Sequence, residues 1–181
     1  SRGLEMCIRD SDKERDVRTN IAGEFQKSNL AAALQTAELI CGRLDEDKIY
    51  EALSQIRISG RMEEIAPGII VDVSHNIQGM QGFVQTVEAN YHGMKKRILF
   101  AASHQNEEEY MKNILKTIPE IEAFYTVGIH KRRIDEAEFQ DAFRKMIDRN
   151  QETTVCFVVG SFYLAGMAKE FINQEEENVR L

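Results

Sequence analysis

The sequence predicts an α/β fold in which a mainly parallel sheet has helices on both faces, preceded by a short helical segment. Four short apolar segments occur from residue 69 onward, and each is followed by a stretch with helical periodicity. This alternation is typical of right-handed βαβ units and a parallel sheet. The first of these segments, Ile69–Val71, is continuously apolar, as expected of a strand that is buried on both faces.

The first 58 residues are expected to contain two helices and no substantial core. Residues 1–20 carry many charges and little periodicity, and we interpret them as a frayed or truncated start. One helix is expected to begin at Ser28 as its N-cap and to end near Gly42, and a second follows Asp45. Apolar residues repeat along these helices at helical spacing: Leu30, Leu34, Ala37, Cys41 and Leu44, then Ile49, Leu53 and Ile56. The segment 57–67 is expected to be an extended connection with a turn at Gly60.

From residue 59 to residue 181 we expect one compact domain of four βα units. The expected strands are residues 69–73, 97–102, 121–127 and 154–159, and the expected helices are about 77–90, 107–118, 136–149 and 162–173. Asn106 with Glu109, and Asp135 with Glu138, have the spacing of a capping box at a helix start. The run of glutamates at 175–177 is interpreted as a solvated tail.

Composition narrows the class of protein. The chain has 181 residues and a formal net charge of −7, from 23 basic and 30 acidic residues, which argues against broad nucleic-acid binding. No apolar run approaches the roughly 20 residues of a membrane helix, and residues 1–20 do not resemble a secretory signal. Cys7, Cys41 and Cys156 have no metal-like spacing. Because Cys41 and Cys156 lie in apolar periodic segments, we predict two buried free thiols and a cytoplasmic protein.

Polar residues follow two of the expected strands and form the candidate site. Asp72, Ser74, His75 and Asn76 end the strand at 69–73, and Gly160-Ser161 ends the strand at 154–159. Ligands of open α/β sheets bind outside the carboxyl ends of the strands, and a helix start favours anions. The alternative interpretation is that Asp72 and Asn76 cap a helix, that His75 is solvated and that Ser161 is an ordinary helix cap.

Two further residues are weaker candidates. Arg61 precedes the first strand and is either a surface charge or a ligand for phosphate oxygens. His104 follows the strand at 97–102 and belongs either to the site or to a helix-entry loop. The chain contains no glycine-rich phosphate loop, no dinucleotide-binding glycine motif and no nucleophile elbow.

Taken together, four motifs resemble the C-terminal part of folylpolyglutamate synthase, including its bifunctional dihydrofolate synthase forms, within the Mur ligase superfamily. In family order they are residues 23–33 (GEFQKSNLAAA), 60–63 (GRME), 72–76 (DVSHN) and 160–164 (GSFYL). Ile77 stands where the family usually has proline, which only pre-sets φ at a helix start. The resemblance implies that residues 1–58 are the end of a central ATPase domain. It also implies that residues 59–181 are the glutamate ligase domain.

The resemblance further implies an ATP-dependent ligation in which a folate carboxylate becomes an acyl phosphate and the amine of L-glutamate attacks it. It assigns Asn29 and Gln26 to adenine, and Arg61 and Asp72 to ATP. It assigns His75, as the catalytic residue, together with Ser161, Gly160 and Asn76, to the substrates L-glutamate and folate or dihydropteroate. Ligands for Mg²⁺, the phosphate loop and a modified lysine would precede residue 23, so we expect the chain alone to be inactive. We also expect a monomer, since the sequence leaves no long exposed apolar stripe. The alternatives are a non-catalytic α/β ligand-binding module and a Mur-type cell-wall peptide ligase.

Overall fold

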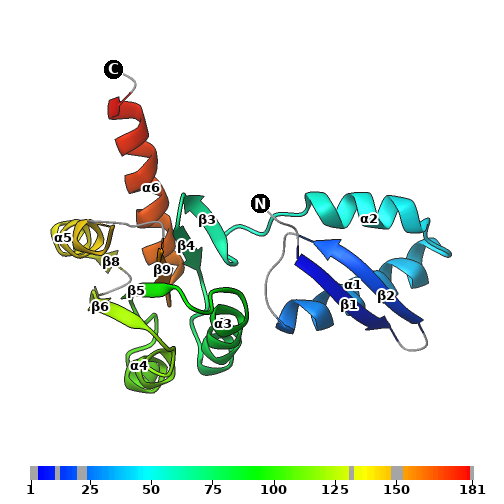
Figure 1. The fold of residues 1–181 in the computed structure, drawn as a ribbon, viewed down its shortest axis with the longest axis horizontal. Coiled ribbons are helices and arrows are strands. Elements are labelled where there is room, and N and C mark those ends of the chain that lie inside the picture. Colours follow the sequence, from blue (N-terminus) through cyan, green and yellow to red (C-terminus); the bar gives the residue numbers. More distant parts are fainter. Residues whose placement is uncertain (1–3, 11–12, 20–23, 131–132, 148–152, 180–181) are drawn as a thin grey trace. The chain divides into compact units, whose positions relative to one another are not determined.

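The computed structural model describes residues 4–10, 13–19, 24–130, 133–147 and 153–179 (Figure 1). The chain divides into two compact units, Ser1–Ser59 and Gly60–Leu181. Each unit is described by itself.

The first unit begins with a β-hairpin, so our interpretation of residues 1–20 as a frayed start is wrong. Strands β1 (Leu4–Asp10) and β2 (Lys13–Thr19) pair antiparallel over seven residues each. The register sets Glu5 opposite Arg18 and Arg9 opposite Glu14. These strands were missed because charged residues interrupt the apolar periodicity by which a strand is recognised.

Helices α1 (Glu24–Cys41) and α2 (Glu46–Gln55) complete the first unit. Helix α1 begins four residues before Ser28, so Ser28 lies inside the helix and is not its N-cap. Helix α2 follows Asp45, as predicted. Asp45 is its N-cap, and its Oδ1 accepts the backbone N–H of Asp47 at 3.1 Å. Among the residues of this unit whose side chains the structure describes, three leucines are buried together in a small apolar core: Leu30, Leu34 and Leu53.

The exposed end of α1 corrects a second prediction. Cys41 was expected to be buried, but it is exposed. The buried side chains of α1 end at Leu34, and its last two turns also expose Leu39 and Ile40. Gly42 then ends the helix in the left-handed region, at φ +79°.

The second unit is built on a five-stranded sheet in the order β3-β4-β9-β5-β6. Four strands are parallel to one another: β4 (Ile69–Asp72), β9 (Thr154–Val159), β5 (Lys95–Phe100) and β6 (Ile121–Thr126). The predicted mainly parallel α/β fold is therefore confirmed. Strand β3 (Glu63–Ala66) pairs antiparallel with β4 at the edge, where we had expected an extended connection. Short strands β7 (Ile129–His130) and β8 (Arg133–Ile134) form a separate hairpin.

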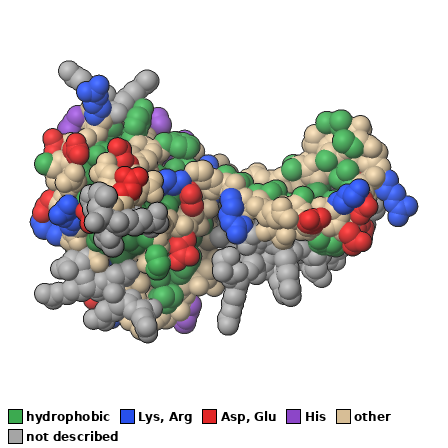
Figure 2. Space-filling model, turned by 90° about the horizontal axis from the view of Figure 1, so that it is seen from above, with side chains coloured by type: hydrophobic (Ala, Val, Ile, Leu, Met, Phe, Trp, Pro, Cys, Tyr) green, Lys and Arg blue, Asp and Glu red, His purple; other side chains and the backbone are tan. Residues whose placement is uncertain are grey.

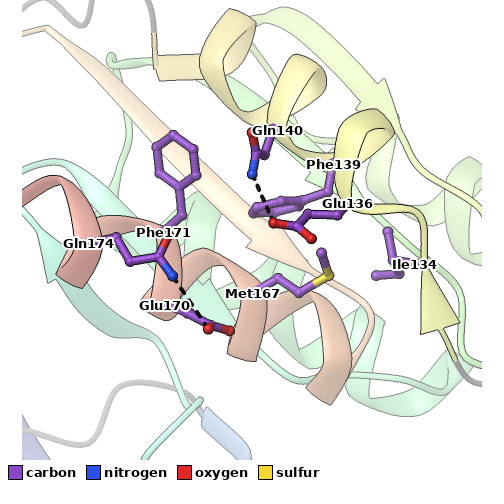
Figure 3. Close-up of a pocket in the computed structure, with 8 residues that line it drawn as sticks. All are labelled: Ile134, Glu136, Phe139, Gln140, Met167, Glu170, Phe171 and Gln174. Carbon is purple, nitrogen blue, oxygen red and sulfur yellow. Dashed lines mark hydrogen bonds between the residues drawn. The ribbon is translucent and has the colours of Figure 1, made fainter.

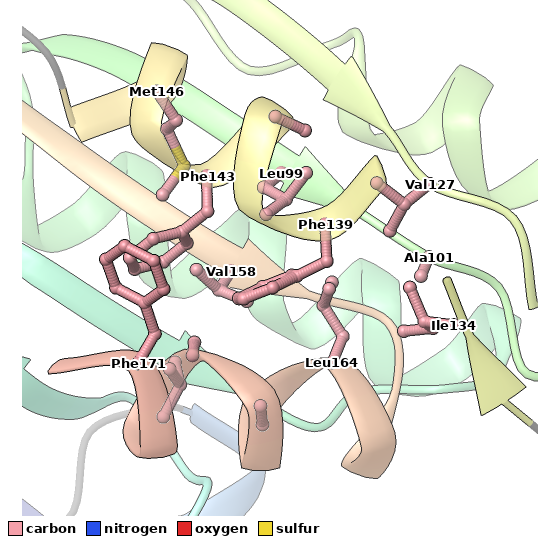
Figure 4. Close-up of a cluster of buried hydrophobic side chains, with 14 of the residues drawn as sticks. Leu99, Ala101, Val127, Ile134, Phe139, Phe143, Met146, Val158, Leu164 and Phe171 are labelled. Atoms are coloured by element: carbon pink, nitrogen blue, oxygen red, sulfur yellow. The ribbon is translucent and has the colours of Figure 1, made fainter. Parts of the chain in front are cut away.

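Helices cover both faces of this sheet. Helices α3 (Ile77–Asn90) and α4 (Glu108–Leu115) pack on one face, against Ile98, Phe100 and Phe157. Helices α5 (Glu136–Ile147) and α6 (Phe162–Val179) pack on the other. Figure 4 shows that second core, in which side chains of both helices meet Leu99 and Val158. Because successive side chains of a strand point to opposite faces, each central strand contributes to both cores.

In the second unit, two predictions about helix ends differ from the structure. A short 3₁₀ turn, η1 (Gln105–Glu107), precedes α4 without a side-chain cap, so the predicted capping box of Asn106 and Glu109 is wrong. The run of glutamates at 175–177 lies inside α6 and not in a tail. By contrast, Asp135 Oδ1 does accept the N–H of Glu138 at 2.9 Å at the start of α5. Cys156 is fully buried in β9, as predicted.

Candidate functional site

The polar ends of β4 and β9 leave the sheet at one edge because the two strands are parallel neighbours. Asp72 pairs with Val159 in the register, so the residues that follow each strand emerge side by side. On the other side of β9, Phe100 of β5 also pairs with Val159. Three strand ends therefore meet at this edge, where open α/β sheets hold their ligands.

Asp72 organises the backbone around the end of β4. The residue is only 2% exposed, and both carboxylate oxygens accept backbone hydrogen bonds: Oδ1 from Ser74 at 2.9 Å and Oδ2 from Met62 at 3.0 Å. The N–H of Val73 donates to the carbonyl of Gly60 at 2.8 Å. These bonds hold the loop that carries Arg61 against the end of the strand.

His75 and Asn76 occupy the turn from β4 into α3. His75 Nδ1 lies 2.9 Å from the carbonyl oxygen of Val73, which can only accept, so Nδ1 carries the proton and Nε2 is the other available nitrogen. Asn76 is the N-cap of α3, and its Oδ1 accepts the N–H of Gly79 at 2.7 Å. The helix begins at Ile77 without the usual proline, so the fold tolerates this departure.

Gly160 and Ser161 form the turn from β9 into α6. Gly160 has φ +108°, and a Cβ there would lie 2.5 Å from the carbonyl oxygen of Ala101. Ser161 is fully buried, and its Oγ accepts the N–H of Tyr163 at 3.1 Å. The hydroxyl therefore caps the helix, which is the ordinary role that the sequence left open. The ring of Phe162 stands beside His75, with 5.6 Å between ring centroids.

The second unit brings together five of the predicted site residues at this edge: Asp72, His75, Asn76, Gly160 and Ser161. Arg61 lies in the adjacent loop. Asn29 and Gln26 lie in α1 of the first unit, where Asn29 Nδ2 donates to Gln26 Oε1 at 3.0 Å. The roles assigned to all these residues remain predictions.

Sequence reasoning missed two features of the site. Ser103 Oγ donates to the carbonyl oxygen of Gly160 at 3.4 Å, which links the loop after β5 to the turn after β9. Ser74 Oγ is buried without a hydrogen-bond partner in the described part of the chain. The pairing of β5 with β9 could have suggested the first of these, but the order of the strands is not written in the sequence.

The shifted pKa values lie away from this edge. Burial raises the pKa of the Cys156 thiol to about 11, and burial together with Glu64 raises that of Tyr91 to about 12. A hydrogen bond from the buried Lys96 lowers the pKa of the Glu120 carboxyl at the other end of β5.

Among the described residues, no group of three or more His, Cys, Asp or Glu side chains is arranged to hold a metal ion.

A separate pocket lies between α5 and α6 (Figure 3). It has a volume of about 220 Å³, an apolar floor that includes Phe139 and Met167, and a rim that includes Glu136 and Glu170. It contains none of the predicted site residues.

On the face drawn in Figure 2, basic and acidic side chains of the described residues are interspersed. None of the described helices is long and apolar enough to span a membrane.

Comparison with solved structures identifies the class of fold. The apo form of folylpolyglutamate synthetase from Lactobacillus casei superposes with a TM-score of 0.75 at 19% identity, over 94% of this chain and 42% of that one. Escherichia coli FolC with DHPP and ADP gives 0.75 at 16%, over 93% and 44%. A pseudomurein peptide ligase type C from Methanothermus fervidus gives 0.70 at 18%, over 95% and 40%. The fold is that of the C-terminal part of Mur-type ligases, and the folylpolyglutamate synthases are among its structural neighbours.

Curated proteins agree with this likeness. A dihydrofolate synthase/folylpolyglutamate synthase of Bacillus subtilis is 23% identical over 109 residues, which is 57% of this chain and 25% of that protein. A UDP-N-acetylmuramoyl-L-alanyl-D-glutamate–2,6-diaminopimelate ligase of Aquifex aeolicus is 26% identical over 111 residues, 60% of this chain and 23% of that one. No protein-family profile matches the sequence. The predicted resemblance is thus confirmed, and the match spans about a quarter of each curated relative.

Proposed function

We propose that this chain is the C-terminal part of an ATP-dependent ligase that adds L-glutamate to a folate, with dihydropteroate as a further acceptor. The observation that carries the proposal is the convergence of two family-like motifs, 72–76 and 160–164, at one edge of the sheet. Support also comes from the similarity to folylpolyglutamate synthases in fold and in sequence.

In the proposed reaction, ATP supplies the phosphoryl group that activates the folate carboxylate as an acyl phosphate. The amine of L-glutamate attacks the acyl carbon, an amide bond forms, and phosphate leaves. The ammonium group of L-glutamate must first lose a proton. His75 is the proposed acceptor, since its Nδ1–H is held by the Val73 carbonyl and Nε2 remains as a base in the neutral ring.

The other residues bind and orient the substrates. Arg61 places a positive charge beside the phosphates, held there by the loop that Asp72 organises. The amide edges of Asn29 and Gln26 suit hydrogen bonds to adenine. Ser161 caps α6 and Asn76 caps α3, so both helix starts face the same edge of the sheet and favour a carboxylate. In this scheme the Ser161 hydroxyl acts by ordering the backbone at Gly160 and at the helix start.

We further propose that the chain needs a phosphate-binding domain that is not among these 181 residues. Its sequence has no glycine-rich phosphate loop, and it covers less than half of the solved ligases that it resembles. The Mg²⁺ ligands would belong to that domain as well. The expected result is no ATP hydrolysis and no glutamate ligation by the isolated chain. Turnover by the isolated chain at rates typical of enzymes, about 1 s⁻¹ or more, would contradict this proposal.

The decisive experiment measures ligation by a polypeptide in which this sequence follows a phosphate-binding domain. Arg61→Ala is expected to raise the KM for ATP at least about tenfold, because a charge-assisted hydrogen bond is lost. Ser161→Ala is expected to raise the KM for L-glutamate and to leave that for ATP unchanged. Arg133→Ala, at the exposed position of β8, is the matched control and should alter neither. Unchanged kinetics for both site variants would refute the assignment.

A Mur-type peptide ligase is the second candidate, favoured by the similarity to the Aquifex aeolicus ligase. The two candidates differ in the acceptor of the amino acid. Release of ADP that depends on glutamate and a folate supports the first. Release that depends on a nucleotide-linked peptide supports the second. A polypeptide that binds these compounds but releases no ADP would instead be a non-catalytic ligand-binding module.

A further inference from the structure

The loop that carries Arg61 is fixed by contacts of its backbone, while the guanidinium stays open to a ligand. The N–H of Gly60 donates to Glu63 Oε2 at 2.5 Å, and the carbonyl of Gly60 accepts the N–H of Val73 at 2.8 Å. The side chain of Arg61 is half-buried and forms no hydrogen bond or ion pair with any other described residue. The position of the guanidinium therefore depends on how its backbone is held.

Both neighbours of Arg61 have left-handed backbone conformations. Gly60 has φ +72°, and Met62 has φ +45°, which residues with a side chain rarely adopt. Such a conformation persists where the surrounding structure imposes it, and it is frequent at functional sites. One constraint is the bond from the N–H of Met62 to Asp72 Oδ2 at 3.0 Å. The other is the carboxylate of Glu63 on the Gly60 side.

Glu63 connects this loop to α6. The oxygen that accepts the N–H of Gly60 also forms an ion pair with Lys169 Nζ at 2.5 Å. The side chains of Glu63 and Lys169 are 33% and 28% exposed, so the pair is largely shielded from water. Lys169 lies about two turns along α6 from its start at the candidate site. The pair thus joins the Arg61 loop to the helix that begins beside Ser161.

We propose that Glu63 and Lys169 are positioning residues for Arg61. Their ion pair holds the Gly60 end of the loop against α6 and so fixes the guanidinium relative to the strand ends of the candidate site. Without the pair, the acceptor of the Gly60 N–H is free to turn away, and Arg61 samples positions away from the phosphates. This inference rests on the proposed function in assigning Arg61 to ATP.

The first test uses the 181-residue chain and needs no ligand. Backbone amide hydrogen exchange is followed by NMR in Lys169→Met, which keeps the apolar stem and removes the ammonium group. Exchange at Gly60 and Val73 is expected to be about fivefold faster, as for the loss of a partly shielded ion pair. Lys169→Arg retains the pair and should exchange like the unaltered chain. The amide of Gly79, held by Asn76 Oδ1 in α3, is the internal reference.

The second test measures ligation by the polypeptide in which this sequence follows a phosphate-binding domain. Lys169→Met is expected to raise the KM for ATP about fivefold, less than Arg61→Ala does, and to leave the KM for L-glutamate unchanged. In an Arg61→Ala background it should add nothing, because no guanidinium is left to position, whereas a merely structural effect would add. Lys145→Met, which removes an ion pair with Asp141 on α5, is the matched control and should change neither KM.

The outcomes separate this inference from the proposed function. Unchanged exchange at Gly60 in Lys169→Met would overturn the positioning role and has no bearing on ligation. A KM for ATP that rises in Arg61→Ala but not in Lys169→Met, or effects of the two changes that simply add, would overturn it and leave the proposed function standing. An unchanged KM in Arg61→Ala as well would refute the assignment of Arg61 to ATP, and the positioning role fails with that assignment.

Discussion

Gly160 is the position at which one added methyl group should do most harm. It links β9 to α6, and its φ of +108° is a conformation that side-chain-bearing residues rarely adopt. A Cβ there would lie 2.5 Å from the carbonyl oxygen of Ala101 and 2.7 Å from Cε2 of the Phe100 ring. The carbonyl of Ala101 belongs to the backbone of the loop after β5. Because the N–H of Ala101 donates to the carbonyl oxygen of Val159 at 3.2 Å, the Ala101 backbone cannot simply rotate away from an added Cβ.

The cost of Gly160→Ala has two parts. The unfavourable backbone conformation costs about 1–3 kcal/mol, and overpacking a well-filled site costs about 1–3 kcal/mol. We therefore expect the free energy of unfolding to fall by about 4 kcal/mol. That is a large share of the 5–15 kcal/mol or so that is typical of a folded domain.

The assay is urea denaturation followed by far-ultraviolet circular dichroism, with two control variants from the same unit. Gly93→Ala has a positive φ of +75° and open space around it, so it should cost only about 1 kcal/mol. Gly166→Ala, also in open space but inside α6, should gain up to about 1 kcal/mol. If Gly160→Ala costs no more than Gly93→Ala, the close approach of the two strand ends is not as described, and the geometry of the candidate site fails with it.

Three further predictions concern single side chains. Ser74→Ala removes a buried hydroxyl without a described partner, and thermal unfolding should show unchanged or raised stability, by up to about 1 kcal/mol; a loss of that size would reveal an undetected hydrogen bond. In a Cys7→Ser background, iodoacetamide at mildly alkaline pH should modify exposed Cys41 quickly. Buried Cys156, whose pKa is raised to about 11, should react only in denaturant, and equal rates would contradict its burial. Because the pKa of Tyr91 rises from 10.0 to about 12 on folding, the unfolded chain ionises first, so stability should fall as the pH rises through this range. Tyr91→Phe should lessen the fall, and an identical pH profile would refute the assignment.

The βα units of the second unit could be predicted because its central strands contain continuous apolar runs. Residues 154–159 are buried at every position, and only Thr154 at the start of this strand is polar. Strand β3 could not be found in this way, since Glu63 and Glu64 give it the charged character that protects the edge of a sheet. The β1–β2 hairpin was missed for a related reason: residues 1–20 are rich in charge, and the periodicity of apolar residues does not detect such strands.

The residues of the candidate site could be predicted from the sequence, but their hydrogen bonds and their burial could not. Asp72 and Ser161 could be singled out because polar residues ended apolar strands. Both carboxylate oxygens of Asp72 accept backbone N–H groups. One of these comes from Met62, ten residues earlier, beside the antiparallel edge strand that the sequence did not predict. That Ser161 is fully buried depends on the packing of α6 against the sheet. Such tertiary contacts decide whether a polar residue touches a ligand or orders the residues that do.

The position of β9 has a consequence for how this protein is made. Of the described strands it comes last from the ribosome, yet it takes the middle place between β4 and β5. Until residues 154–159 emerge, both neighbours display unsatisfied edges, and the nascent polypeptide depends on slow, long-range pairing. Residues 154–159 must therefore be synthesised before the strand ends of the candidate site can come together, and stalling before that point would leave an aggregation-prone intermediate that calls for chaperones.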